Sequence, residues 1–126
     1  MISDSSIGWA PPERVKRSVQ LPEWLDREIE KAARENRSTP AVLIADALEQ
    51  AVEKGWTGSQ EPPVPGVPDS ERSIALDPRI SEELDKRIKQ AEASGRTADF
   101  SELTALLALY YLRHQLNVVT EEPSGE

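Results

Sequence analysis

Apolar and polar residues alternate with a period of two near the start of the chain. In residues 15–21, Val15, Arg17, Val19 and Leu21 fall on one side, and the polar residues between them fall on the other. This alternation is typical of a strand with one apolar face. We therefore predict a short strand over this segment.

After this strand, apolar residues recur at the spacing of a helix. Pro22 falls at an early helical position, and Leu25, Ile29 and Ala33 form an i, i+4, i+8 stripe that ends near Asn36. The pattern predicts one helix with a single apolar side.

A second helix is predicted between Thr39 and Gly55. Thr39 is a suitable N-cap, Pro40 suits the first helical position, and Gly55 is a typical stop. The apolar side of this helix consists of Val42, Leu43, Ala47, Leu48 and Val52.

The same scheme occurs again in the second half of the chain. Residues 17–21 (RSVQL) match residues 72–76 (RSIAL) at an offset of 55, and a helical stripe of Ile80, Leu84 and Ile88 follows. The second half is therefore predicted to repeat the order of strand, helix, turn and helix.

The last helix of the repeat is displaced by a further few residues. Residues 41–44 match residues 101–104 at an offset of 60, so the second block holds about five extra residues. We place these at 91–97, around Gly95, where they would lengthen the turn between the helices.

The predicted last helix begins with a capping signal. Asp99 stands three residues before Glu102, which is the spacing of a capping box. Its apolar side consists of Leu103, Leu106, Leu107, Tyr110 and Tyr111.

Proline and glycine divide the chain into two blocks with shorter flanking segments. We predict a flexible leader over 1–12, blocks over 13–55 and 69–116, a Pro/Gly-rich linker over 56–68, and an acidic tail over 117–126. A block of about 45 residues is near the lower limit for independent folding, so the two should share a core. The linker allows pairing within one chain or exchange between two chains.

Net charge alone argues against a partner made of nucleic acid. The chain carries a net charge of −8, whereas phosphate affinity comes from Lys and Arg. The blocks 13–55 and 69–116 have net charges of only −1 and −2, because the remaining acids lie in the tails and the linker. Each block can thus present a locally basic face, and the densest basic cluster is residues 14–17.

The composition does not indicate a reaction centre. The chain has no cysteine and a single histidine, His114, which is expected at the surface, and it lacks a glycine-rich phosphate loop. We expect no catalytic residue, metal or cofactor. No apolar run approaches the ~20 residues of a membrane helix, and the first residues lack a secretory signal, so we predict a cytoplasmic protein without a membrane partner. Four aromatic residues are expected to pack in the core or interface, rather than to stack on bases: Trp24, Trp56, Tyr110 and Tyr111.

Residues 16–29 (KRSVQLPEWLDREI) and 37–48 (RSTPAVLIADAL) resemble the ribbon-helix-helix family, the Arc/MetJ-type repressors. The resemblance implies a mainly α fold in which two copies pair their strands into an antiparallel ribbon that enters the major groove of DNA. A tandem chain would supply both strands and form an intramolecular pseudo-dimer.

The resemblance implies that the outward side chains of the first strand contact the DNA bases. Lys16 can donate to guanine, Gln20 can pair with adenine, and Ser18 can bond to either. The N-terminus of the second helix would hold a phosphate. These residues can equally be an ordinary solvent-facing strand and a simple helix cap. The residues expected to contact DNA are Arg14, Lys16, Arg17, Ser18, Gln20, Thr39, Ala41, Arg72 and Ser73.

The second repeat has different outward residues. Glu71, Ser73 and Ala75 replace the first strand's three, and Asp99 replaces the neutral cap. The Glu71 carboxylate would repel phosphate, although it can accept a hydrogen bond from the cytosine amino group. Ala75 can contact a thymine methyl group. Asp99 would repel a phosphate. We therefore expect the first repeat to make most base and phosphate contacts, so the target need not be palindromic.

Two classes of function follow. The first is a sequence-specific binder of double-stranded DNA, as a repressor or as an accessory factor for plasmid transfer or partition, which can also assemble with itself on DNA; tandem chains of this family are similar to conjugation accessory proteins. The alternative is a protein-interaction module, antitoxin-like or scaffold, which binds a protein partner through the second repeat and the acidic tail and binds DNA weakly or not at all.

Overall fold

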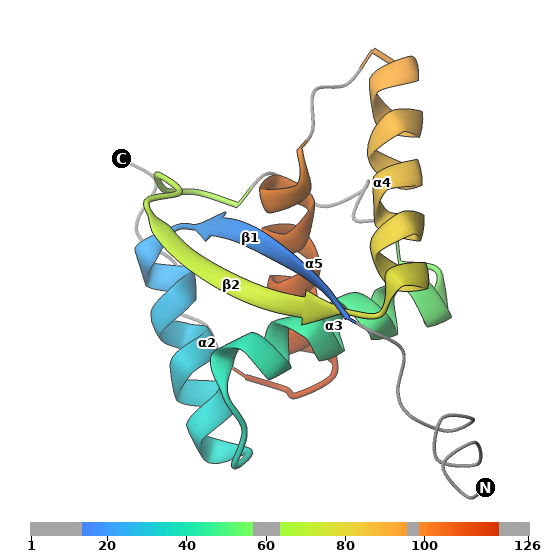
Figure 1. Ribbon diagram of the computed structural model, residues 1–126. Coiled ribbons are helices and arrows are strands. Elements are labelled where there is room, and N and C mark those ends of the chain that lie inside the picture. Colours follow the sequence, from blue (N-terminus) through green and yellow to red (C-terminus); the bar gives the residue numbers. More distant parts are fainter. Residues whose placement is uncertain (1–13, 57–63, 96–98, 119–126) are drawn as a thin grey trace, which may run out of the picture.

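The computed structural model describes residues 14–56, 64–95 and 99–118. Within them the order strand, helix, helix occurs twice, as Figure 1 shows. The predicted combination of helices with one two-stranded antiparallel sheet is confirmed. The elements are β1 (Val15–Leu21), α2 (Glu23–Glu35), α3 (Pro40–Lys54), β2 (Ser70–Leu76), α4 (Pro78–Ala93) and α5 (Phe100–His114).

Strands β1 and β2 pair along their whole length. Ser18 lies opposite Ser73 at the centre, and Val15 lies opposite Leu76 at one end. Because Ser18 and Ser73 are also matched by the internal repeat, exchanging the two repeats leaves this register unchanged. The sheet therefore has an approximate two-fold relation about its central serines.

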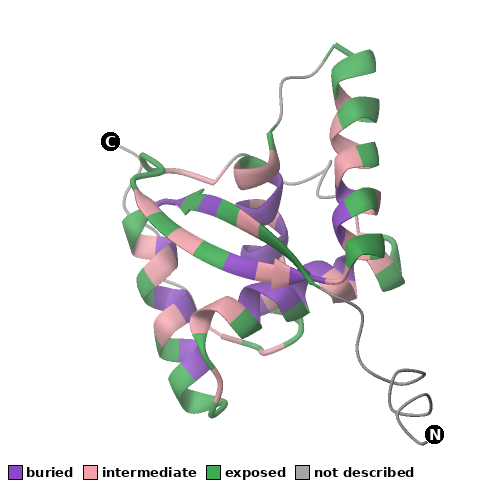
Figure 2. Ribbon diagram, in the orientation of Figure 1, coloured by how far each residue is buried: buried purple, intermediate pink, exposed green. Residues whose placement is uncertain are grey.

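One side of the sheet faces the helices, and the other does not. Val19, Leu21, Ile74 and Leu76 are buried on the inner side, as the alternating pattern predicts. Helix α3 packs against β2, and helix α5 packs against β1. In Figures 1 and 2 the ribbon lies in front of these helices, with exposed positions alternating along both strands.

The ends of the helices follow the local signals in the sequence. The Thr39 side chain accepts a hydrogen bond from the Val42 amide at 3.2 Å, and Asp99 accepts one from the Glu102 amide at 2.8 Å. Gly55 ends α3 with a φ of 75°, in the left-handed region that favours glycine. Both predicted N-caps and the predicted stop are confirmed.

The extra residues of the second repeat extend a helix as well as a turn. Helix α4 has 16 residues, against 13 in α2. The connection to the next helix covers 94–99 in the second repeat and 36–39 in the first. The prediction that the insertion lengthens the turn is therefore only partly right, because three of the five residues continue the helix. Residues 96–98 of that turn lie outside the described part of the chain.

The described end of the linker packs against the first repeat. The Trp24 indole nitrogen donates to the Pro65 carbonyl oxygen at 2.7 Å. Gly66 has a φ of 108°, and a Cβ there would lie 2.9 Å from the Pro22 Cβ, so this position needs glycine. The predicted leader, residues 57–63 of the linker, and the tail from 119 onward lie outside the described residues.

The aromatic residues pack as expected. Trp24, Trp56 and Tyr111 are partly buried against the core, and the ring of Tyr110 lies 4.7 Å from that of Trp56. His114 is exposed at the end of α5. Among the described residues, no helix is long and apolar enough to span a membrane.

Candidate nucleic-acid interface

The outward side of the ribbon is a row of small and polar side chains that none of the described helices covers. Five of the six are exposed and the sixth, Ala75, is partly buried, which is the face predicted from the alternation. In register, they form the pairs Lys16 with Ala75, Ser18 with Ser73, and Gln20 with Glu71.

Two of these side chains bond to each other across the strands. The Ser18 hydroxyl donates to a Glu71 carboxylate oxygen at 2.9 Å, and this contact is exposed. A diagonal pair of this kind is a normal unit of sheet stabilisation. It also holds the Glu71 carboxylate on the outward side, towards the centre of the ribbon.

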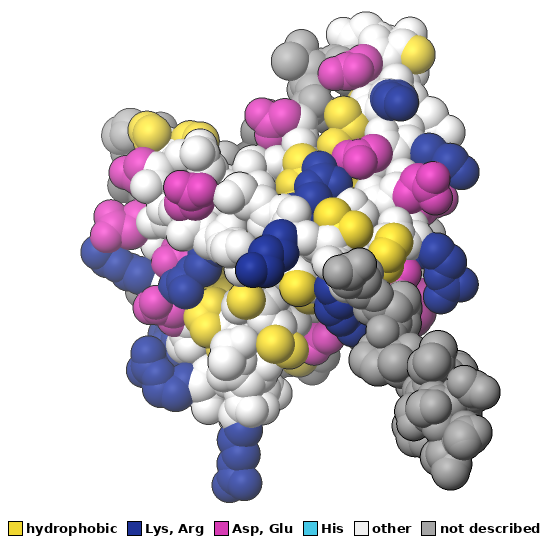
Figure 3. All heavy atoms as spheres, in the orientation of Figure 1, with side chains coloured by type: hydrophobic (Ala, Val, Ile, Leu, Met, Phe, Trp, Pro, Cys, Tyr) yellow, Lys and Arg dark blue, Asp and Glu magenta, His cyan; other side chains and the backbone are white. Residues whose placement is uncertain are grey.

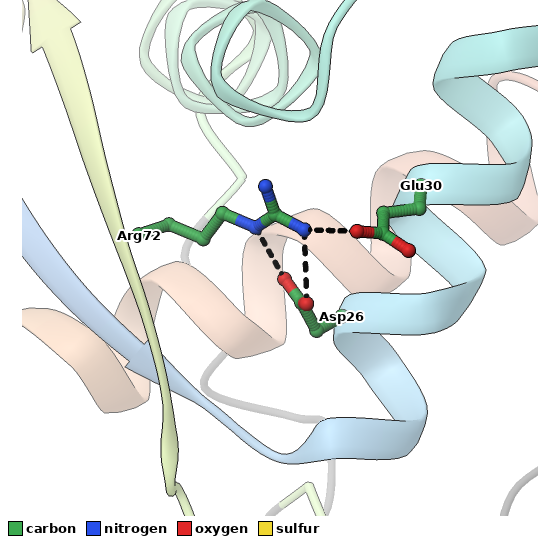
Figure 4. A network of polar contacts seen from close by, with 3 residues as sticks. All are labelled: Asp26, Glu30 and Arg72. Carbon is green, nitrogen blue, oxygen red and sulfur yellow. Dashed lines mark hydrogen bonds and ion pairs between the residues drawn. The ribbon is translucent and has the colours of Figure 1, made fainter.

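Arg72 lies on the inner side of the ribbon and bonds to helix α2 (Figure 4). Its guanidinium donates to both Asp26 carboxylate oxygens, at 2.7 and 3.0 Å, and to Glu30 at 2.6 Å. The hydrogen bonds to Asp26 raise the pKa of Arg72 above its ordinary value. This side chain is therefore fixed in a charged, bidentate contact within the protein.

Arg17 makes the corresponding contact with helix α4. It donates to the Ser81 hydroxyl at 2.7 Å and to both Asp85 carboxylate oxygens at 3.2 Å. Its guanidinium carbon also lies 3.9 Å from the centroid of the Phe100 ring. Each repeat thus provides an inward arginine that reaches the first helix of the other repeat.

The two inward arginines are among the residues expected to contact DNA, but they do not lie with the others. Arg17 and Arg72 are not brought to the outward face with Lys16, Ser18 and Gln20, because their guanidinium groups bond to helix side chains. The alternation already placed Arg17 on the apolar side. Its partners were missed because they stand more than 60 residues away in the sequence.

Arg14 lies at the ribbon end that carries Lys16. Its guanidinium is 3.5 Å from the Ala75 carbonyl oxygen and 3.9 Å from a Glu49 carboxylate oxygen. About half of the Arg14 side chain remains exposed, at 49%. A long, weakly held cation next to the outward face can still reach a phosphate.

The N-termini of α3 and α5 flank the ribbon along opposite edges (Figure 1). The Ser101 hydroxyl, in the first turn of α5, accepts a hydrogen bond from the backbone amide of Gln20 at 2.9 Å. Thr39 is exposed and Ala41 is partly buried at the start of α3. The predicted phosphate-binding residues therefore lie at a helix start beside the ribbon.

Comparisons with known proteins give no match. No family model, no curated protein and no solved structure matches the chain. The interface must therefore be assessed on its own chemistry.

The outward side of the ribbon mainly offers hydrogen-bonding groups to a partner. Basic and acidic side chains are interspersed on the face seen in Figure 3, so no single-sign patch dominates it. Within 14–56, 64–95 and 99–118, no group of three or more His, Cys, Asp or Glu residues is placed to hold a metal ion. The outward ribbon offers an ammonium, an amide, two hydroxyls and a carboxylate in one row, a set that can distinguish hydrogen-bond donors and acceptors on a partner.

Proposed function

We propose that this protein binds double-stranded DNA in a sequence-specific manner, by inserting the ribbon of β1 and β2 into the major groove. In this proposal the chain is a tandem ribbon-helix-helix pseudo-dimer. Such a protein would act as a transcriptional repressor or as an accessory factor in plasmid transfer or partition. The observation that carries the proposal is the exposed, polar outward face of an isolated two-stranded ribbon.

The dimensions and chemistry of the ribbon suit this role. A two-stranded ribbon fits the major groove, where each base pair presents a distinct set of donors and acceptors. Lys16, Gln20 and the serines Ser18 and Ser73 carry matching groups on the outward side. The inner arginines support the ribbon from behind, so the outward side chains start from a fixed backbone.

Selection from a randomised duplex pool, followed by fluorescence anisotropy across a range of salt concentrations, tests the proposal. The wild-type chain should enrich a motif, and its affinity for that motif should fall as salt rises. The variant Lys16→Ala/Ser18→Ala/Gln20→Ala should lose the preference. Its matched control is Lys89→Ala/Gln90→Ala/Ser94→Ala, which removes the same three residue types from exposed positions at the end of α4.

A second candidate is a protein-interaction module, favoured by the carboxylates at the interface. Glu71 lies on the outward face, Asp99 caps α5, and the chain has a net charge of −8. If the wild-type chain binds no duplex even at low salt, DNA binding is excluded and this candidate takes its place.

A further inference from the structure

The antiparallel register places unlike chemistry at the two ends of the ribbon. In one direction the outward face ends with Lys16 and Ala75, and Arg14 lies beside them. In the other direction it ends with Gln20 and Glu71. We name these the Lys16 end and the Glu71 end.

Each end contains residues from both repeats. The first repeat supplies Lys16 to one end and Gln20 to the other, because the strands run in opposite directions. The difference between the repeats therefore becomes a difference between the ends. The Lys16 end carries two cations, and the Glu71 end carries a carboxylate.

The helix starts add to this polarity. At the Glu71 end, the hydrogen bond from the Gln20 backbone amide to the Ser101 hydroxyl places the first turn of α5 next to the strand. Asp99 caps that turn with a second carboxylate. In the internal repeat, Ser101 corresponds to Ala41 and Asp99 corresponds to the neutral Thr39. The Glu71 end thus has a carboxylate on the outward face and a second one at the adjacent helix cap, whereas the nearest carboxylate to Arg14 among the described residues at the Lys16 end, that of Glu49, lies 3.9 Å from its guanidinium.

We propose that the ribbon is a polarised reading head that binds a non-palindromic DNA target in one orientation. This inference rests on the proposed DNA-binding function and specifies its target. The Lys16 end supplies phosphate affinity and a donor for guanine, and Ala75 contacts a thymine methyl. The Glu71 end selects bases by hydrogen bonding: Glu71 accepts from the cytosine amino group, and Gln20 pairs with adenine.

Glu71 acts in this scheme as a determinant of specificity. Its carboxylate is held at the outward face by the Ser18 hydroxyl, at 2.9 Å. A carboxylate lowers affinity for any DNA through repulsion of phosphate, but it rewards a base with an amino donor in the groove. Glu71→Gln should therefore raise affinity for unrelated duplex a few-fold and relax the preference for cytosine at one position of the motif. Lys16→Ala should lower affinity roughly tenfold and relax the opposite half of the motif.

The decisive experiment makes the two strands alike. Glu71→Lys/Ala75→Gln gives both strands the same three outward side chains, at one exposed and one partly buried position of the outward face. Its control, Glu82→Lys/Ala93→Gln, makes the same chemical changes at exposed positions of α4. Thermal unfolding should show that both variants remain folded, with at most a small loss in Glu71→Lys/Ala75→Gln from removal of the Ser18–Glu71 bond.

Selection from a randomised duplex pool then separates the possible results. The inference expects a non-palindromic motif for the wild type and the control, and a palindromic motif for Glu71→Lys/Ala75→Gln. A palindromic motif for the wild type, or an unchanged motif in the double variant, overturns the polarised reading head and leaves DNA binding intact. Absence of any duplex binding by the wild type overturns the proposed function itself.

Discussion

Helices α2 and α4 carry matching apolar stripes, but the protein buries them to different extents. Helix α2 buries five residues, whereas the longer α4 buries two, Ser81 and Leu84. Figure 2 shows the difference as exposed and intermediate surface along most of α4. The internal repeat relates Leu25 to Ile80; the first is fully buried, and the second is only partly buried. A stripe of correct spacing is therefore not sufficient for burial.

One residue gives a physical reason for the difference. Ala32 of α2 is buried, and the corresponding residue of α4 is Arg87. The Arg87 side chain is 16% exposed and donates a hydrogen bond to the Trp56 carbonyl oxygen, just beyond α3. A small residue lets two helices approach closely, whereas a guanidinium that must reach a carbonyl needs space between them.

The largest expected effects come from truncating the two stripes. Leu25→Ala should lower the free energy of unfolding by about 3 kcal/mol, and Ile80→Ala by about 1 kcal/mol, because only the first side chain is fully buried. Urea denaturation measures both. Ile29→Ala and Leu84→Ala are the matched controls, since both residues are fully buried and should cost similar amounts. Equal losses for Leu25→Ala and Ile80→Ala would show that α4 is packed as tightly as α2.

Removing the arginine that bonds to α2 should cost more stability than removing the arginine that bonds to α4. Arg72→Met is expected to cost about 2 kcal/mol, because it leaves the Asp26 carboxylate, which is 14% exposed, without its partner. Arg17→Met should cost about 1 kcal/mol, because Asp85 is 49% exposed and water can solvate it.

Thermal and chemical denaturation compare these two variants. Adding Asp26→Leu to Arg72→Met should recover part of the loss, because the unpaired charge is then removed. If both arginine variants keep full stability and instead lose DNA affinity, the guanidinium groups contact DNA and do not tie the ribbon to the helices.

A buried hydroxyl provides a test of opposite sign. Thr104 is fully buried, and its hydroxyl oxygen has no hydrogen-bond partner within the described part of the chain, whereas the first repeat has the buried Ile44 at the corresponding position. Thr104→Val should stabilise the protein by about 1 kcal/mol, because an unsatisfied polar group costs free energy on burial. The reverse change, Ile44→Thr, should be destabilising. A loss of stability in Thr104→Val would mean that the hydroxyl makes a favourable bond.

The smallest effect concerns Tyr111, which occurs where the first repeat has Ala51. Burial raises the pKa of Tyr111 above its ordinary value near 10, with a smaller effect from Asp46. A raised pKa favours the neutral phenol in the folded state. Its stabilising contribution is therefore complete below pH 10 and is lost as pH rises through the folded-state pKa. The stability difference between wild type and Tyr111→Phe should stay constant up to about pH 9.5 and then change in favour of the variant; a flat difference up to pH 11 contradicts this.

Local signals predicted most of the fold. Pro40, Gly55 and Asp99 set helix ends through backbone geometry and capping, which depend on neighbours in the sequence. The period of two in 15–21 and its copy in 72–76 predicted the two strands and their outward face, and the family resemblance supplied the expectation that these strands pair.

Contacts between the repeats could not be predicted in this way. Arg17 was assigned to DNA as part of the basic cluster 14–17, and Arg72 as its counterpart in the second repeat, but their carboxylate partners come from helices far along the chain. The sequence also suggested that the repeats differ as units. Antiparallel pairing distributes each repeat over both ends, so the outward chemistry differs between the ends of the ribbon.

The pairing of β1 with β2 inside one polypeptide has a consequence for dilution. When two separate chains supply the strands, folding requires association. By mass action, dilution then favours the dissociated, unfolded chains, so the folded fraction falls with concentration. In the proposed pseudo-dimer the two strands meet in a unimolecular step, and the hydrogen bond from Trp24 to Pro65 holds the chain just before β2. The melting temperature should therefore be the same at nanomolar and micromolar protein, and a cell holding a few copies would keep the ribbon intact.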